Sequence, residues 1–225
     1  FVGQADSMNS AFGQISKAIL LAVILIYMVL AAEFESFVGE PMKALVERLS
    51  GFMLSIDPAF ETKPSRVISR IYRDTRFSKD KSLFRDCMWL AFKRGGKEWQ
   101  SHPAFYFEIS PHGYRYGMGF YEAGRENMDA LRAAIDRDPK SFEAVSAPVE
   151  ADGFELAGDE YKRTIKPHTP YLAKYYQKKS FYMVKNREIG QAVFDENFAD
   201  ELAAEFGKLK EFYLYLSKMT TELFF

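Results

Sequence analysis

Three short aromatic-rich segments between residues 88 and 121 constrain the fold of this chain most strongly. They are residues 88–93 (MWLAFK), 104–110 (AFYFEIS) and 114–121 (YRYGMGFY). Each is rich in residues that favour β-strands, and each alternates in part between apolar and polar positions. Because only Pro111, His112 and Gly113 separate the second segment from the third, these two are predicted to form an antiparallel hairpin.

Helical patterns lie on both sides of these strands. Apolar residues recur every three or four positions in residues 42–54, 126–137 and 197–216, and Gly207 would mark a break in the last of these helices. Residues 154–162 and 180–184 would each add a strand. Strands gathered between helical ends predict an α+β fold with a mostly antiparallel sheet flanked by helices, and argue against a doubly wound sheet.

Composition narrows the class of protein. A chain of 225 residues with 48% hydrophobic and 16% aromatic residues buries a substantial core and makes one or two domains. Its single cysteine, Cys87, excludes an internal disulfide and fits a reducing compartment, so we expect the main domain to be cytoplasmic. The three histidines, His102, His112 and His168, lack metal-ligand spacing. We therefore expect no metal and no cofactor.

Residues 18–32 form an apolar run of uncharged residues between Lys17 and Glu33. The run is shorter than the roughly 20 residues that span a bilayer, although uncharged flanks would extend it. Because it is hydrophobic on all sides, it is either embedded in lipid or buried as a core helix. The residues alone leave these two alternatives open.

Residues 1–37 resemble a segment of resistance-nodulation-division efflux transporters, where a periplasmic domain runs into a transmembrane helix. The ending YMVLAAEFESF is the most specific part. The resemblance covers about one helix of a protein that has many, so it implies no transport activity. It does imply that residues 12–37 would tether the chain to the inner membrane.

Residues 38–225 resemble a different family, the bacterial DUF2461 family of unknown function. The matching pieces are Arg70–Lys81 (RIYRDTRFSKDK), Gly117–Tyr121 (GMGFY), Leu131–Ile135 (LRAAI) and the region around Lys178–Ser180. That family normally opens with a helical segment containing asparagine and tryptophan, and here the transporter-like segment takes its place. The resemblances divide the chain into residues 1–37, a hydrophobic helical segment, and residues 38–225, an α+β domain. They favour a chimeric sequence over a natural fusion.

Positive charge is concentrated between Lys63 and Lys97, where eleven basic and three acidic residues give a net charge of +8 in a chain whose total is −1. Such a segment suits an anionic ligand, because guanidinium groups match phosphate and carboxylate geometry. The candidate ligand-binding residues are Arg70, Arg73, Asp74, Arg76, Lys79, Asp80 and Lys81. Asp74 and Asp80 would orient the cations or act as acid/base groups. The alternative is a surface loop held by Arg–Asp pairs, which are often worth little.

A second basic region interleaves cations with tyrosines. It comprises Lys162, Arg163, Lys166, Lys174, Lys178 and Lys179 beside Tyr161, Tyr171, Tyr175 and Tyr176. Such a pattern would bind single-stranded nucleic acid through phosphates and base stacking. A solvated helix face with half-buried tyrosines is the interpretation we favour, and the net charge of −1 weakens the nucleic-acid interpretation further.

Other single residues give weaker signals. His168 lies between prolines in a predicted turn and is more often incidental than a general base. Cys87 is expected to be a small core residue and not a nucleophile. No catalytic residue can be named, so whether the protein is an enzyme stays open. The sequence therefore predicts a domain that binds a small anionic or phosphorylated ligand. The alternative is a non-catalytic module that contacts nucleic acid or protein.

Overall fold

The computed structural model describes residues 19, 21–23, 25, 39–73, 76, 81–82, 84–96, 98–120, 123–167 and 169–221. The chain divides into two compact units, Phe1–Ala44 and Leu45–Phe225. In the first unit, the described residues of the apolar run are Ile19, Leu21–Val23 and Leu25, and they are helical. The predictions for the rest of that run lie outside the described residues. The junction expected near residues 35–41 is described only at residues 39–41, which are helical. No helix in the described part is both long enough and apolar enough to cross a membrane.

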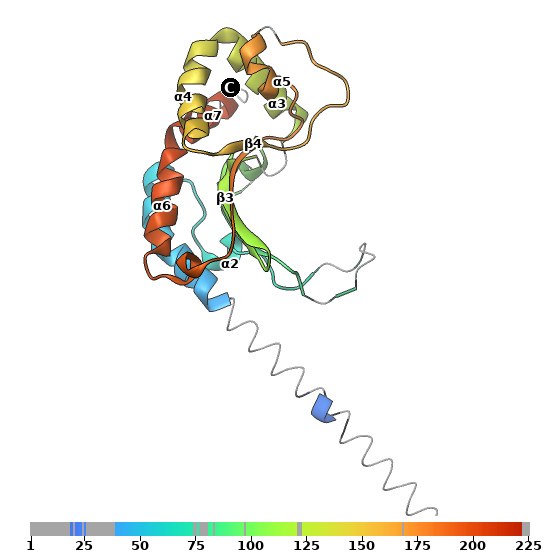
Figure 1. Cartoon of the computed structure of the whole chain (residues 1–225), viewed down its shortest axis with the longest axis vertical. Coiled ribbons are helices and arrows are strands. Elements are labelled where there is room, and N and C mark those ends of the chain that lie inside the picture. Colours follow the sequence, from blue (N-terminus) through green and yellow to red (C-terminus); the bar gives the residue numbers. More distant parts are fainter. Residues whose placement is uncertain are drawn as a thin grey trace, which may run out of the picture. The chain divides into compact units, whose positions relative to one another are not determined.

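The second unit begins with helical residues 45–56 and alternates helices with strands (Figure 1). The helices are α2 (Pro64–Val67), α3 (Arg125–Arg137), α4 (Pro139–Ala151), α5 (Ala173–Tyr176), α6 (Phe198–Lys208) and α7 (Lys210–Thr221). Short 3-10 turns are η1 (Glu98–Gln100), η2 (Pro170–Leu172) and η3 (Gln191–Phe194). The strands are β1 (Met88–Phe92), β2 (Ala104–Ser110), β3 (Gly113–Gly119), β4 (Glu155–Ala157) and β5 (Tyr182–Arg187).

The five strands form one sheet in the order β1-β2-β3-β5-β4, and every neighbouring pair is antiparallel. The β2–β3 hairpin, which the short Pro-His-Gly link predicts, is paired from Ala104↔Gly119 to Ser110↔Gly113. After β3 the chain leaves the sheet through α3 and α4 and returns as β4 at an edge. Strand β5 then fills the place between β3 and β4. The α+β class with an antiparallel sheet is confirmed.

Gly117 and Gly119 of β3 lie where strand β5 approaches closely. A Cβ atom on Gly117 would lie 1.9 Å from the carbonyl oxygen of Met183 in β5, and one on Gly119 would lie 2.4 Å from that of Phe181. Real Cβ atoms do not approach a backbone oxygen so closely. Glycine is therefore required at these positions for β3 and β5 to pair.

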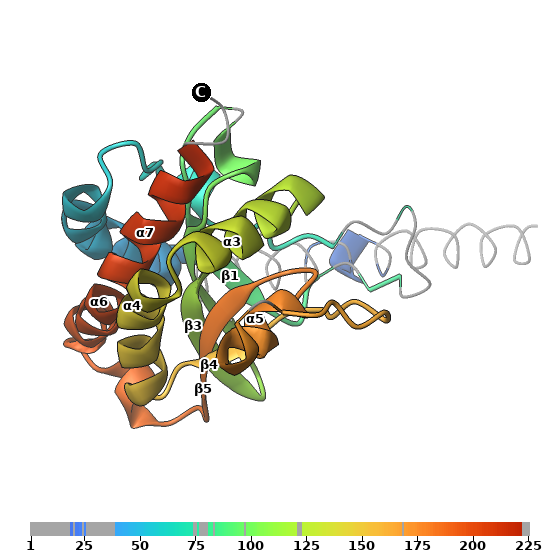
Figure 2. The same ribbon diagram turned by 90° about the horizontal axis from the view of Figure 1, so that it is seen from above.

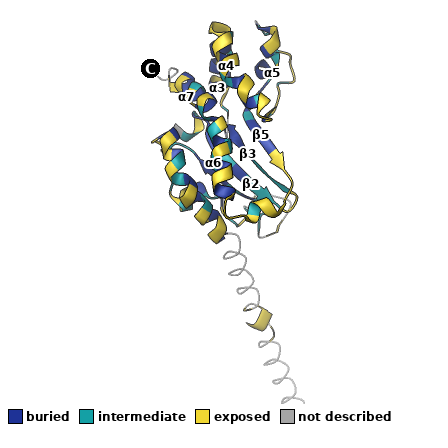
Figure 3. Ribbon diagram, turned by 60° about the vertical axis from the view of Figure 1, so that its left-hand side comes forward, coloured by how far each residue is buried: buried dark blue, intermediate teal, exposed yellow. Residues whose placement is uncertain are grey.

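One face of the sheet, here called the helix face, packs against α6 and α7 (Figures 1 and 3). Its centre is Phe105 of β2, whose ring centroid lies 5.2 Å from that of Phe206 in α6 and 5.1 Å from that of Tyr213 in α7. Further along, Phe212 of α7 lies 5.7 Å from Phe142 of α4. The burial of these rings fixes the helices on the sheet, since large aromatic side chains dominate core energetics.

Two helical features differ from the sequence expectations. The sequence patterns predicted no helix directly after residue 137, but Pro139 opens α4. Proline is tolerated in the first helical turn, and Asp138 accepts a hydrogen bond from the Ser141 N–H at 3.0 Å. The broken C-terminal helix is confirmed, although α6 continues through Gly207 and the break falls at Leu209. A Cβ on Gly207 would meet the ring of Phe52 at 3.6 Å, so this glycine lies at a helix–helix contact.

Candidate functional site

The arginine-rich segment leaves the sheet beside β1. Ile68 bridges Leu90, and the Ser69 N–H donates to the carbonyl oxygen of Trp89 at 2.8 Å. The chain then forms a two-stranded excursion in which Tyr72 bridges Phe84 and the Arg85 N–H donates to the Ile71 carbonyl at 2.9 Å. We call the described part of this excursion, residues 70–73, 76, 81–82 and 84–86, the arm. This backbone pairing holds the described strands of the arm together.

The structure places four of the predicted site residues on the arm: Arg70, Arg73, Arg76 and Lys81. Asp74, Lys79 and Asp80 lie outside the described residues, so their predicted roles are untested. The carboxylate that contacts Arg73 is that of Asp86, with 3.3 Å between the guanidinium and Oδ1. Arg73 is largely buried there, whereas Asp86 is exposed.

The sheet contributes side chains that the sequence reasoning did not single out. Strand alternation puts Trp89, Tyr106, Glu108, Arg115 and Tyr182 on the face opposite α6 and α7, here called the second face. Glu108 and Arg115 are register partners across the hairpin and form an ion pair of 2.8 Å. The turn between the strands is Pro111-His112, because Gly113 already pairs with Ser110. The three-residue link expected from the sequence would have paired Glu108 with Tyr116, so the Glu108–Arg115 pair was not predictable in this way.

Tyr106 occupies the middle of the second face. Its hydroxyl is buried and has no hydrogen-bond partner within the described part of the chain. Its ring lies 6.2 Å from that of Tyr182, at nearly a right angle. Burial raises the pKa of Tyr106, and the positive charge of Arg115 opposes the rise. This phenol therefore stays protonated and can act as a hydrogen-bond donor.

Cys87 lies where the arm rejoins the sheet. Burial, followed by the charges of Glu108 and Asp86, raises the pKa of its thiol, while Arg85 and Arg115 oppose the rise. The thiol is thus held in its protonated, weakly nucleophilic form. Cys87 is, however, half-buried and not the core residue that the sequence predicts.

Only part of the second basic region is engaged in the fold. The Lys174 ammonium lies 2.6 Å from the carboxylate of Glu150, and Lys178 is buried and lies 3.0 Å from that of Glu160. Tyr175 and Tyr176 are also buried. By contrast, Lys162, Arg163 and Lys166 are exposed in the loop between β4 and α5. Figures 1 and 2 show this loop and the arm extending from the side of the sheet that α6 and α7 do not cover.

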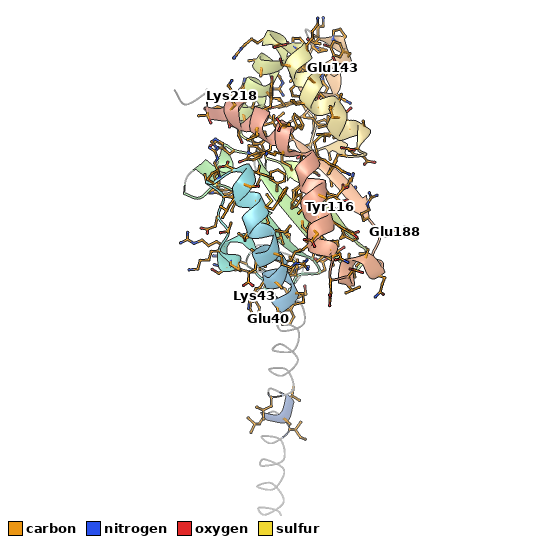
Figure 4. The ribbon with its side chains drawn as sticks, turned by 90° about the vertical axis from the view of Figure 1, so that its left-hand side faces the viewer. Glu40, Lys43, Tyr116, Glu143, Glu188 and Lys218 are labelled. Carbon is orange, nitrogen blue, oxygen red and sulfur yellow. The ribbon has the colours of Figure 1, made fainter. Side chains whose placement is uncertain are left out.

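Two further polar clusters have a structural role. On the helix face, Tyr116 (labelled in Figure 4) donates to Glu205 of α6 at 3.2 Å. The buried Lys185 contacts the same carboxylate. The second cluster is centred on Arg94, which follows β1. Arg94 contacts both Asp57 and His102, with 2.9 Å between its Nη1 and His102 Nε2. Because arginine only donates, Nε2 of His102 accepts this bond. The first cluster connects α6 to strands β3 and β5. The second connects the end of the first helix, at Asp57, to the residues that follow β1.

His168, the remaining candidate general base, lies outside the described residues. Among the residues that are described, no three His, Cys, Asp or Glu side chains gather closely enough to hold a metal ion. The site is therefore characterised by arginines, tyrosines and one tryptophan.

Comparisons with known proteins identify a family. No curated protein matches the chain, and no solved structure matches it either. A family model does match residues 30–215, and its description is "Conserved hypothetical protein (DUF2461)". The match covers most of the chain and includes the arm, the sheet and α6. The chain therefore belongs to the DUF2461 family.

Proposed function

We propose that the chain binds a small anionic or phosphorylated ligand where the arm meets the second face of the sheet. The observation that carries this proposal is the place where the arm enters the sheet. The arm runs directly into β1, and Trp89 of β1 is the register partner of Glu108, whose carboxylate pairs with Arg115 of β3. An anion at this place would be held by groups that approach it from two directions.

The ion pairs at this place support an anion site. Asp86 contacts Arg73, and Glu108 contacts Arg115, so each carboxylate fixes the orientation of one guanidinium. A guanidinium has five donors, and one carboxylate does not occupy all of them. On Arg115, the N–H groups that Glu108 does not occupy would bind a phosphate or carboxylate through charge-assisted hydrogen bonds.

The rest of the arm adds positive charge. Arg70, Arg76 and Lys81 are exposed on it. Such a local concentration of one sign raises the local concentration of counter-ions and speeds their association. In the segment between Lys63 and Lys97 the net charge is +8, so this attraction would act on any small anion that approaches the arm.

Isothermal titration with inorganic pyrophosphate tests the proposal. We expect Arg73→Ala and Arg76→Ala each to weaken binding about tenfold or more, since hydrogen bonds to charged groups are worth about 1.5–3 kcal/mol. Arg125→Ala is the matched control, because Arg125 is an exposed arginine of α3 that pairs only weakly with Asp129, at 3.4 Å. Circular dichroism would establish that each variant is folded.

Unchanged affinity in the arm variants, or an equal loss in Arg125→Ala, would contradict the proposal. Loss of the fold in Arg73→Ala would mean that the Arg73–Asp86 pair has a structural role instead. Binding seen with an oligonucleotide and not with pyrophosphate, and falling steeply with salt, would favour the interaction-module alternative.

A further inference from the structure

We infer that the ligand is a nucleoside phosphate, whose phosphate contacts the cations of the arm and whose planar ring stacks on Tyr72. This inference rests on the function proposed above and specifies its ligand class. The evidence for it is Tyr72, an aromatic residue of the arm whose side chain has no role in the anion site proposed above.

Tyr72 is an exposed aromatic residue in the middle of the basic segment. Its side chain is 59% exposed, although most of a tyrosine is apolar surface that would be better buried. The ring does not lack support, because its centroid lies 5.6 Å from that of Phe84 with an angle of 31° between the planes. Phe84 thus holds one side of the ring, and the exposed side remains accessible to a planar group.

Cations flank this ring in the chain. Arg73 follows Tyr72 directly, and Arg70 precedes it by two positions. Arg70 is exposed and makes neither a hydrogen bond nor an ion pair with any residue in the described ranges. The segment therefore combines the Tyr72 ring, which Phe84 contacts on one side, with the Arg70 guanidinium, which pairs with none of the described residues. Stacking on an aromatic ring together with contacts to phosphate is how proteins bind nucleotides without reading the base.

Tyr171, another exposed tyrosine of this chain, does not combine an exposed ring with an available cation. Tyr171 is 57% exposed, close to the value for Tyr72. However, the basic residue one helical turn after it, Lys174, is engaged by Glu150 at 2.6 Å. Tyr171 therefore has an exposed ring without an available cation beside it in the chain, and it provides a matched control.

The test compares AMP with ribose 5-phosphate, which carries the same phosphate and sugar without the base. Isothermal titration of the full chain should show AMP binding about tenfold more tightly, the factor that corresponds to about 1.4 kcal/mol and lies within the range for one stacked base. Tyr72→Leu should remove this difference and leave the affinity for ribose 5-phosphate unchanged. Tyr72→Phe keeps the aromatic ring and Tyr171→Leu lies outside the proposed site, so both variants should still bind AMP more tightly than ribose 5-phosphate.

The outcomes separate this inference from the function on which it rests. Equal binding of AMP and ribose 5-phosphate by the wild-type chain would contradict the inference of a nucleoside phosphate. The proposed binding of a small anion would still hold. The same conclusion would follow if Tyr72→Leu kept the preference for AMP. If AMP, ribose 5-phosphate and inorganic pyrophosphate all failed to bind, both the inference and the proposed function would be wrong.

Discussion

The Nε atom of Arg94 lies 2.8 Å from Oδ2 of Asp57, and this pair joins the end of helix 45–56 to the residues that follow β1. Tyr213 of α7 donates a hydrogen bond to the same carboxylate. Asp57 is buried, and the Arg94 side chain is 21% exposed. Three elements that are distant in sequence thus meet at one buried charge.

Replacing Asp57 by alanine should therefore destabilise the protein. The change leaves Arg94 and Tyr213 without their shared acceptor, and removing one partner of a buried ion pair costs about 3–5 kcal/mol. We expect the free energy of unfolding, measured by urea denaturation, to fall by about 3 kcal/mol. Arg125→Ala is again the control: its ion pair is exposed, so a change below about 1 kcal/mol is expected. Equal effects of the two substitutions would show that the Asp57 cluster does not stabilise the fold.

Asp57 should also make stability depend on pH. Burial alone raises the pKa of this carboxyl, but hydrogen bonds from Tyr213, the Ala59 N–H and Arg94 outweigh burial and hold the pKa below its ordinary value of 3.8. The folded state thus keeps the carboxylate charged at pH values where the unfolded chain would protonate it. This contribution is present above pH 3.8 and is lost as pH falls through the folded pKa. Between pH 6 and pH 3, Asp57→Asn should lose less stability than the wild type in urea titrations. A parallel decline in both proteins would contradict the assignment.

Gly117→Ala should disrupt the sheet. The new Cβ would meet the Met183 carbonyl oxygen at 1.9 Å, and that backbone atom can move only if β3 and β5 separate. We expect a loss of about 3 kcal/mol or more, at or beyond the upper end of the cost of overpacking, measured as a lower melting temperature. Gly51→Ala is the matched control, because nothing lies within 4 Å of a Cβ built on Gly51 in helix 45–56. That change should stabilise the protein by about 0.5–1 kcal/mol. A tolerated alanine at position 117 would mean that the two strands need no close approach.

Cys87 should react slowly with thiol reagents. Since burial and the neighbouring carboxylates of Glu108 and Asp86 raise the pKa of the thiol, its rate of reaction with a disulfide reagent should reach half its maximum only above pH 9.0, the ordinary value. The urea-unfolded chain provides the reference rate and should react faster at pH 8. Faster reaction of the folded protein would indicate an activated thiol.

Local patterns predicted the strands and the helices that correspond to residues 42–54, 126–137 and 197–216, because strand alternation, helical spacing and turn residues depend on neighbours in the sequence. The one-turn helices α2 and α5 were not predicted. Helix α4 was missed because Pro139 serves equally well as the end of one helix and as the first turn of the next. The position of β5 between β3 and β4 was not predictable in this way, since it depends on pairing across more than sixty residues of chain.

Only the part of the candidate site that lies in one continuous stretch of sequence was predictable. The arm is one contiguous basic segment and is visible in the sequence. Arg115 joins it only through the hairpin register, and Trp89 and Tyr182 only through strand alternation. The Asp57–Arg94 pair spans 37 residues, and neither member belongs to a local motif. Such contacts are fixed by the tertiary fold, and no short pattern records them.

The edges of the sheet affect how copies of this chain meet in concentrated solution. Beside β1, residues 60, 68 and 69 already bond to the outer edge, through the Phe60↔Arg94 and Ile68↔Leu90 bridges and the Ser69 amide. At the opposite edge, β4 is three residues long. Within the described part of the chain, the sheet thus offers a second copy no long row of unpaired amides on which to extend. Intermolecular β-aggregation from the native state should consequently be slow, and fibril growth would first require one of these edges to open.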